Sequence, residues 1–414
     1  MATAARLAKA GHPVELFERR PVLGGRWRPV EVPGVGIVDA APAVLGFPAP
    51  WRDLFRKSGR PLEAELARSG HALVPAAGAR YRFADGAELT LPTERAEQHA
   101  VLGAAYGPAV AGRWQGLLDE LDDVWQTLRP LGLEAELAHR SQLPRPVRAR
   151  LRSRQSLARL AAGLREPHLE ALVRSVAHRY GSTPERTPAW VAVELSVARR
   201  FSRWQVVPRD AQRHPADTGR SSVLAEALGA RLALRRVEVH RERPVLGLLV
   251  EGGRVAGVRT ADAERVPAAA VVVTTDPWQL VDLLPAGADR PLACGVRRTH
   301  PAAAPALSHT HSAQPCEQVS ETVELSGDGV PVVSYRRPAG EGTIVSRHDH
   351  GHSQPDPGSG VAWRGFGSWL RRPPVVTSVT GLYTAGPSSR AGNGPSATIL
   401  SAALAAAACH DRHR

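Results

Sequence analysis

Lysine, cysteine and aromatic residues are all scarce in this sequence, and each shortage excludes a class of protein. Only two of the 53 basic residues are lysines, Lys9 and Lys57, so the net charge of +13 comes almost entirely from arginine. Ala, Pro and Gly are abundant as well, and GC-rich codons account for part of this arginine excess. Nucleic-acid-binding surfaces need a concentrated basic stripe with interleaved aromatics. Aromatics make up only 5% and the basic residues are scattered, so we expect no nucleic-acid partner.

One basic segment, Arg145–Arg154, is an exception to that scatter. It reads RPVRARLRSR and contains no aromatic residue. Two interpretations remain open for it. The segment is either the solvated face of a helix or a surface attracted to anionic lipid headgroups. The second interpretation predicts peripheral contact with the inner face of a membrane.

Signals of membrane-spanning, secreted or metal-binding proteins are also lacking. No apolar run reaches the roughly 18 residues that cross a bilayer, and no charged segment followed by an apolar one marks a signal peptide. The cysteines, Cys294, Cys316 and Cys409, form no CxxC pair and are expected to be reduced thiols. The alternating histidines of 348–352 have no second ligand cluster to complete a site. We therefore expect a soluble, cytoplasmic chain without a metal.

The sequence does contain enough apolar material for two or three domains, since 43% of its 414 residues are hydrophobic and a domain takes about 100–200 residues. Ala2–Ala10 is predicted to form a helix that Gly11 ends. Val14–Phe17 then has the pattern of a short strand, with Glu18 at its end. Helix, tight turn, strand and acidic residue make up the second half of a βαβ unit.

The remaining chain divides into a helical middle and two β-rich stretches. The predicted elements are a strand at Val35–Val38, a hairpin at Arg80–Leu91, helices between residues 94 and 200, a helix at Ser221–Ala233 capped by Ser221 or Ser222, strands at Val237–Val239, Val245–Val250, Arg254–Thr260, Val271–Thr275, Gln318–Leu325 and Val330–Tyr335, a short helix at Val361–Leu370, a strand at Leu382–Ala385 and a helix at Pro395–Cys409.

Three features of this order carry chemistry. Glu18 stands where an acidic side chain accepts hydrogen bonds from a ribose diol, and six residues later Gly24–Arg26 (GGR) lets backbone and a guanidinium approach a phosphate. Near the other end, a strand, the glycine-rich segment Gly386–Gly394 and a helix start place free N–H groups around one point. Between them lies a strand meander, Val237–Asp276, that rejoins a parallel sheet. Each feature alone also fits an ordinary loop or scaffold.

Together the features resemble the FAD-dependent oxidoreductases of the phytoene desaturase and amine oxidase type, which have two dinucleotide-binding segments. Asp39–Leu45 (DAAPAVL) is similar to that family's D-x-G-P-x-x-L segment, and Trp51–Gly59 and Phe201–Trp204 resemble the stretches that follow it. The resemblance covers nearly the whole chain and is weakest in residues 95–200. It implies an α/β fold, with an FAD/NAD(P)-binding Rossmann-like domain and a second, helical plus β domain that holds the substrate.

The resemblance also implies a division of the chain and a set of cofactor-binding residues. Residues 1–94, 220–290 and 375–414 would form the FAD-binding domain, and residues 95–219 and 291–374 the substrate domain. Glu18 would bind the adenosine ribose, and Val245 would contact the adenine through its backbone. The other residues that would line the pyrophosphate and the flavin are Gly24, Gly25, Arg26, Gly386, Asn393, Gly394, Pro395 and Ser396.

Three departures from the family pattern stand out. The G-x-G-x-x-G turn and its strand, expected directly before Ala2, are missing, while Ala41 and Pro387 replace the usual glycine and acidic residue. We interpret Met1 as an internal residue of a longer natural chain; the alternative is a truncated form lacking one central strand of the sheet.

The resemblance implies hydride removal from a small, apolar, isoprenoid-like molecule. The alternatives are an amine oxidase, a redox-neutral flavin isomerase, and a non-catalytic remnant of a flavoprotein. The sequence assigns no catalytic residue and leaves the oligomeric state open.

Overall fold

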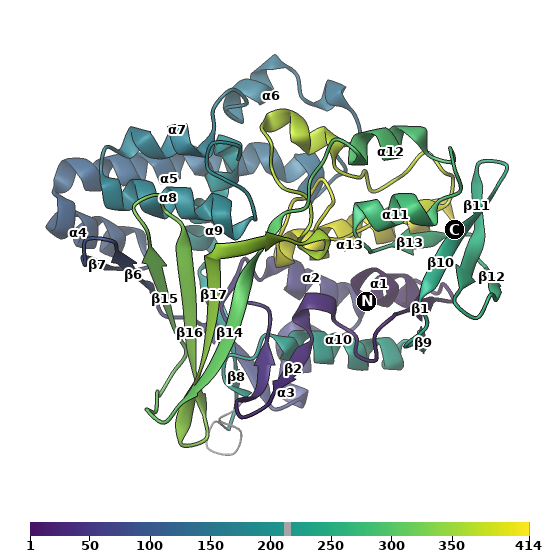
Figure 1. The fold of residues 1–414 in the computed structure, drawn as a ribbon, viewed down its shortest axis with the longest axis horizontal. Helices are drawn as coiled ribbons and strands as arrows, with labels where there is room; N and C mark the ends of the chain where they lie inside the picture. Colours follow the sequence, from purple (N-terminus) through teal and green to yellow (C-terminus); the bar gives the residue numbers. More distant parts are fainter. Residues whose placement is uncertain (211–216, 414) are drawn as a thin grey trace.

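The structure is a computed structural model that describes residues 1–210 and 217–413. Its α-helices are α1 (Ala2–Lys9), α2 (Ala49–Ser58), α3 (Leu62–Arg68), α4 (Arg95–Tyr106), α5 (Pro108–Leu128), α6 (Arg145–Arg150), α7 (Leu157–Ala161), α8 (Pro167–Arg179), α9 (Val193–Phe201), α10 (Ser222–Leu234), α11 (Pro277–Leu283), α12 (Arg290–Val296) and α13 (Pro395–Arg412). Its strands are β1 (Glu15–Phe17), β2 (Pro29–Val32), β3 (Gly36–Asp39), β4 (Leu45–Gly46), β5 (His71–Pro75), β6 (Ala79–Phe83), β7 (Glu88–Leu91), β8 (Arg203–Pro208), β9 (Glu238–His240), β10 (Val245–Glu251), β11 (Arg254–Thr260), β12 (Arg265–Pro267), β13 (Val271–Val273), β14 (Ala303–Ser312), β15 (Ser320–Leu325), β16 (Pro331–Ala339), β17 (Gly342–Pro355) and β18 (Leu382–Thr384) (Figure 1).

Segments from both ends of the chain and from its middle meet in one part of the molecule. The helix–turn–strand predicted at the start is confirmed: α1 runs into a turn at Gly11, whose φ of +93° suits glycine, and then into β1. Strand β1 pairs in parallel with β9, and β13 pairs in parallel with β18. Among the described residues these are two separate parallel pairs. Helix α13 packs against α1, with the Thr3 hydroxyl donating to the Ala402 carbonyl.

A six-stranded sheet forms the other part, in the order β14-β17-β16-β15-β6-β7. The strands predicted at Gln318–Leu325 and Val330–Tyr335 are confirmed, but β14 and β17 exceed them in length and were not predicted. The hairpin β6–β7 pairs with β15 and so lies in this sheet, whereas the predicted division put it in the first domain. Strand β8, predicted in the second domain, pairs instead with β4 and β5.

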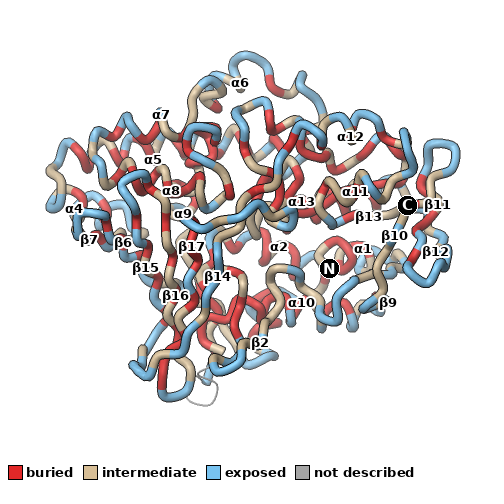
Figure 2. The backbone as a smooth tube through the Cα atoms, in the orientation of Figure 1, coloured by how far each residue is buried: buried red, intermediate tan, exposed pale blue. Residues whose placement is uncertain are grey.

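The predicted helical middle is confirmed and covers one face of this sheet. Helices α5 and α8 share a large apolar core with the sheet, centred on side chains such as Trp114, Leu172, Val323 and Tyr335. The buried backbone runs through this contact, while the outer loops and much of α6 are exposed (Figure 2). Among the residues that the structure describes, no helix combines the length and apolarity needed to cross a bilayer.

The helix predicted at Val361–Leu370 is wrong in its first half. Only Phe366–Arg371 is helical, as a short 3₁₀ segment. Val361 instead bridges to Pro301, and the Gly365 amide donates to the Arg186 carbonyl. Neighbouring segments therefore take the backbone bonds that a longer helix would need.

Helix α10 is capped from another part of the chain, not by its own serines. The Asp39 carboxylate, at the end of β3, accepts hydrogen bonds from the Ser222 amide (3.0 Å) and the Ser221 hydroxyl (3.3 Å). Ser221 makes no side-chain capping bond, contrary to the prediction. Asp39 is 7% exposed and lies within electrostatic reach of Arg220 and Arg337. It therefore ties β3, α10 and the large sheet together.

Replacing this buried cap should cost more than replacing an exposed acid. We expect Asp39→Ala to lower the free energy of unfolding by about 2 kcal/mol, because a capping bond is lost and two arginines lose a neighbouring charge. The exposed Asp282→Ala should change it by less than about 0.5 kcal/mol. Urea denaturation measures both. A loss below that second figure for Asp39→Ala would show that the helix is held without the cap.

Candidate functional site

Glu18 and Val245 are brought together by β1 and its neighbours. The Glu18 amide donates to the His240 carbonyl (2.8 Å), and the Arg243 amide donates to the Glu18 carbonyl (3.0 Å). Two residues further on, Val245 begins β10 and packs in the same apolar cluster as Phe17. The acidic side chain and the start of β10 therefore lie side by side, as a shared adenosine site requires.

The head of α1 faces Glu18. Burial lowers the pKa of the Met1 amino group to about 6, and the nearby Glu18 charge opposes this shift. The first intrahelical bond runs from the Ala5 amide to the Met1 carbonyl, so the amides before it lie outside the α-helical ladder. A helix N-terminus beside a ribose-binding carboxylate is where a pyrophosphate finds free N–H donors.

The two glycines of the GGR loop have different reasons to be glycine. At Gly24 a Cβ would stand 3.2 Å from the Ala225 Cβ, so this residue lets the loop pack on α10. Its φ of +108° also disfavours other residues. At Gly25, with φ +58°, a Cβ would meet nothing within 4 Å. The backbone there is open to a ligand.

Arg26 points to the segment that follows β17. Its Nη1 donates to the Asp356 carboxylate (2.8 Å) and to the Ser359 hydroxyl. The pair is about two-fifths exposed on each side, so screening keeps it weak. The role predicted for Arg26 at the pyrophosphate and flavin stays a prediction, and it requires this pair to open or rearrange.

The predicted strand–loop–helix near the other end is confirmed. Strand β18 leads into a loop at Gly386, which has φ +131°, and the Gly386 amide donates to the Ser401 hydroxyl of α13 (2.9 Å). Gly394 precedes α13 and Pro395 takes its first turn, as predicted. The hydroxyl of Ser388 is buried without a hydrogen-bond partner among the described residues. A buried unpaired hydroxyl in a glycine-rich loop marks a place where a polar ligand atom fits.

Two side chains predicted to line the cofactor already have partners. Asn393 accepts from Arg372 (2.7 Å) and donates to the Tyr180 carbonyl (3.0 Å), and Ser396 donates to the Phe47 carbonyl (3.0 Å). These side chains shape the loop, which leaves backbone amides at the head of α13 for a ligand.

Arg372 organises this loop, and the sequence gave no sign of it. Its side chain is 1% exposed, lies 3.9 Å over the Trp363 ring, and donates to the carbonyls of Val361 and Ser389 as well as to Asn393. Burial lowers the pKa of Arg372 to about 9. No carboxylate pairs with it in the described part of the chain, so carbonyl oxygens and an aromatic face balance its charge.

The second domain presents a buried polar group next to the loop. Tyr180 is hydrogen-bonded to Glu194, and burial, followed by the charge of Glu194, raises its pKa well above the usual value. A Cβ at Gly394 would lie 4.0 Å from the edge of the Tyr180 ring. The start of α13 therefore faces a tyrosine that remains protonated at any physiological pH.

These features fit a dinucleotide cofactor. Gly25 and Gly386 leave open space where a ligand backbone would pass, with no heavy atom closer than 3.8 Å to the Cβ position of Gly386. Two helix heads, one carboxylate and one buried unpaired hydroxyl supply the polar contacts. A groove of about 630 Å³ between β6, β7, β15 and β16 includes none of the predicted site residues and lies away from them.

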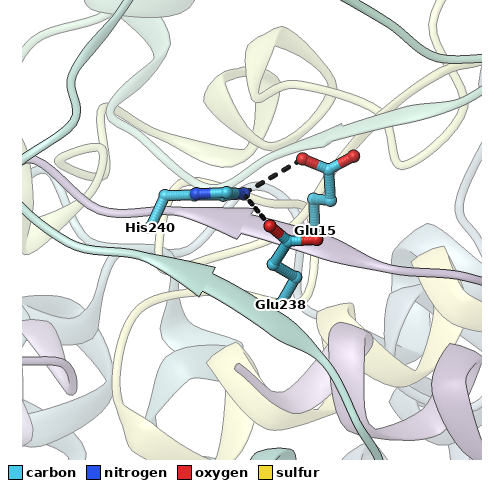
Figure 3. A group of neighbouring side chains, drawn as sticks. All are labelled: Glu15, Glu238 and His240. Carbon is cyan, nitrogen blue, oxygen red and sulfur yellow. Dashed lines mark hydrogen bonds and ion pairs between the residues drawn. The ribbon is translucent and has the colours of Figure 1, made fainter.

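One group of side chains has metal-ligand composition. Glu15, Glu238 and His240 have ligand atoms within 4.8 Å of one another on the paired strands β1 and β9 (Figure 3). The His240 ring nitrogen lies 3.0 Å from Glu15 and 3.5 Å from Glu238, and the ring stacks on Phe17. The imidazole bridges two like charges in neighbouring strands, and this explains the cluster without an ion. The histidines of 348–352 do alternate on β17, but His352 is 81% exposed and pairs with Asp349.

The other two histidines of β17 should make stability fall on acidification. Burial lowers the pKa of His348 to about 3 and that of His350 to about 4, from an ordinary value near 6.5. Below that ordinary value the unfolded chain binds protons that the folded chain refuses. Stability is therefore full above it and lost as the pH falls toward 4, at up to about 1.4 kcal/mol per pH unit for each histidine.

Urea denaturation across this pH range tests the expectation. His348→Phe and His350→Phe should each flatten the decline, while the exposed His352→Phe should leave it unchanged. A decline of the same slope in all three variants would assign the acid sensitivity to other groups.

Comparisons with known proteins agree with this geometry. The family model described as flavin containing amine oxidoreductase matches residues 1–316. Hydroxyneurosporene desaturase of Cereibacter sphaeroides is 30% identical over 290 residues, which cover 68% of this chain and 55% of that protein. The chain thus spans about half the length of the curated relative that it matches.

Solved structures match the fold over nearly the whole chain. Cyclohexylamine oxidase from Brevibacterium oxydans gives a TM-score of 0.64 at 15% identity, covering 100% of this chain and 96% of that one. A putrescine oxidase variant gives 0.65 at 15% identity with the same coverage, and an oxidoreductase from Methanosarcina mazei gives 0.64 at 14%, covering 97% and 96%. The predicted α/β fold is confirmed by these matches. The chain belongs to the flavin-containing amine oxidoreductase family, which includes relatives of carotenoid desaturases and amine oxidases.

Proposed function

We propose that this chain is an FAD-dependent oxidoreductase that removes hydride from a small, apolar, isoprenoid-like molecule. The observation that carries the proposal is the meeting of Glu18, the GGR loop and the head of α13 around two helix N-termini. The relative named as a desaturase supports the choice of substrate class, and the apolar core between helices and sheet supports a water-excluding second domain.

Residues of this chain would hold the cofactor in defined ways. Glu18 would accept hydrogen bonds from the ribose diol, and the amides at the heads of α1 and α13 would donate to the pyrophosphate. Gly25 and Gly386 would allow close backbone approach. Bound flavin supplies the hydride acceptor. The second domain orients the substrate and keeps water away from it.

A second candidate function is amine oxidation. The solved structures with the same fold include enzymes titled putrescine oxidase and cyclohexylamine oxidase. A redox-neutral flavin isomerase and a non-catalytic remnant remain as alternatives. Product analysis with added electron acceptors separates them, because a desaturase yields a new double bond, an amine oxidase a carbonyl compound, an isomerase neither, and a remnant no product.

The visible spectrum of the purified chain tests the cofactor. We expect bands near roughly 370 and roughly 450 nm, either as purified or after adding FAD. Glu18→Gln should raise the dissociation constant for FAD roughly tenfold, because a charge-assisted hydrogen bond is lost. Glu15→Gln, on the same strand but facing His240, should leave it unchanged. A chain that stays colourless with FAD would exclude the proposed oxidoreductase and favour the remnant.

Peripheral membrane contact through Arg145–Arg154 is a further part of the proposal. Helix α6 projects from one end of the molecule (Figure 1), and Arg145 and Arg150 are exposed on it. We expect the chain to bind vesicles that contain phosphatidylglycerol but not vesicles of phosphatidylcholine alone. Arg145→Glu/Arg150→Glu should abolish sedimentation with the vesicles, while the equally exposed Arg236→Glu/Arg241→Glu should not. Binding indifferent to anionic lipid would contradict the proposal.

A further inference from the structure

The inner face of β17 carries polar side chains into the apolar interior of the second domain. On this strand Ser346, His348 and His350 alternate and are all buried. Val333 of β16 pairs with His348, and Tyr335 pairs with Ser346. Paired residues in neighbouring strands share a face, and Val333 and Tyr335 belong to the core between sheet and helices. His348 therefore points to the side on which the helices pack.

His348 has a ring nitrogen that no described residue satisfies. The side chain is 5% exposed, and its Nε2 is buried without a hydrogen-bond partner. Its neighbours are occupied: Tyr335 donates to Glu321 (3.5 Å), and Ser346 bonds the His309 ring (2.9 Å). The Tyr335 ring meets the imidazole edge to face at 5.3 Å and fixes its orientation.

An unpaired buried nitrogen is costly, so its persistence calls for a function. Leaving such a group unsatisfied costs about 1–3 kcal/mol. Burial holds the pKa of His348 near 3, so the ring is neutral and is a poor proton acceptor for catalysis. A neutral imidazole is, however, well suited to bind an uncharged polar group through one hydrogen bond.

The surroundings of His348 combine this polar atom with apolar surface. Leu307 of β14 pairs with His348 on the same face and is 38% exposed, which is unusual for a large apolar side chain in this protein. His348 also lies within electrostatic reach of Arg26 and of Arg179. It therefore stands between the GGR loop and the interior of the second domain.

We propose that His348 is a specificity-determining residue whose free ring nitrogen binds the one uncharged polar group, a hydroxyl or carbonyl, of an otherwise apolar substrate. Leu307 contacts the apolar part beside it. The hydrogen bond fixes the register of a long, featureless molecule, so that one C–H bond and not its neighbour faces the cofactor site. This inference rests on the proposed function for the nature of the reaction, but the binding step itself needs no flavin.

The test compares an alcohol with a hydrocarbon of related skeleton. Calorimetric titration of the purified protein with geraniol and with myrcene measures the preference for a hydroxyl group. We expect the wild type to bind geraniol roughly tenfold more tightly, because a buried polar atom built to pair with a hydroxyl rejects an analogue that lacks it. His348→Phe should remove the preference, and His348→Gln, which keeps a hydrogen-bonding side chain, should retain most of it.

Two controls separate recognition from a structural role. His352→Phe, on the same strand but exposed, should keep the full preference. His348→Phe should also leave the melting temperature unchanged or raise it, because no native hydrogen bond is lost. A wild-type protein that binds both ligands alike or neither, or a His348→Phe variant that keeps the preference, overturns the inference.

The cofactor experiment is independent of this one. A chain that never binds FAD yet prefers geraniol through His348 contradicts the oxidoreductase and leaves the recognition site standing. A chain that binds FAD but shows no such preference leaves the oxidoreductase standing and overturns the recognition site.

Discussion

The buried guanidinium of Arg372 is the contact on which the candidate site depends. It collects the Val361 and Ser389 carbonyls and the Asn393 side chain at one point and is stacked on Trp363. The glycine-rich loop after β18 has little side-chain volume of its own with which to hold a shape. One cation surrounded by carbonyl oxygens supplies that order, and Asn393 passes it on to Tyr180 of the second domain. The cofactor side and the substrate side are therefore positioned by one group.

Local signals in the sequence were sufficient for the parts of the fold that local physics determines. The α1–β1 unit, the β6–β7 hairpin and the β18–α13 connection each have glycine or proline at the position that the backbone requires. Strands β14 and β17 escaped prediction because Pro, Gly, Ser and His obscure their alternation. Pairing with neighbours far along the chain, not local propensity, makes them strands.

The candidate site was predictable as a set of backbone positions and less so as side chains. Glycine at 24, 25 and 386 answers to geometry that a sequence pattern reveals. Partners from distant segments decide what Asn393 and Ser396 do, and no pattern announces them. The same holds for Asp39, which caps a helix 183 residues away, and for His348, whose importance comes from a missing partner.

The bridge from Arg26 to Asp356 and Ser359 has a thermodynamic consequence. An anion that takes the guanidinium must release the segment just after β17, the strand that carries His348. Occupancy of the phosphate position and the order of that segment are then linked functions, and each must alter the other by the same factor. Because the bridge is partly solvated, the coupling is worth no more than about 1 kcal/mol, or a factor of a few in affinity. The loop thus acts as a weak reciprocal connection between the two ends of one cavity wall, sensitive to ionic strength.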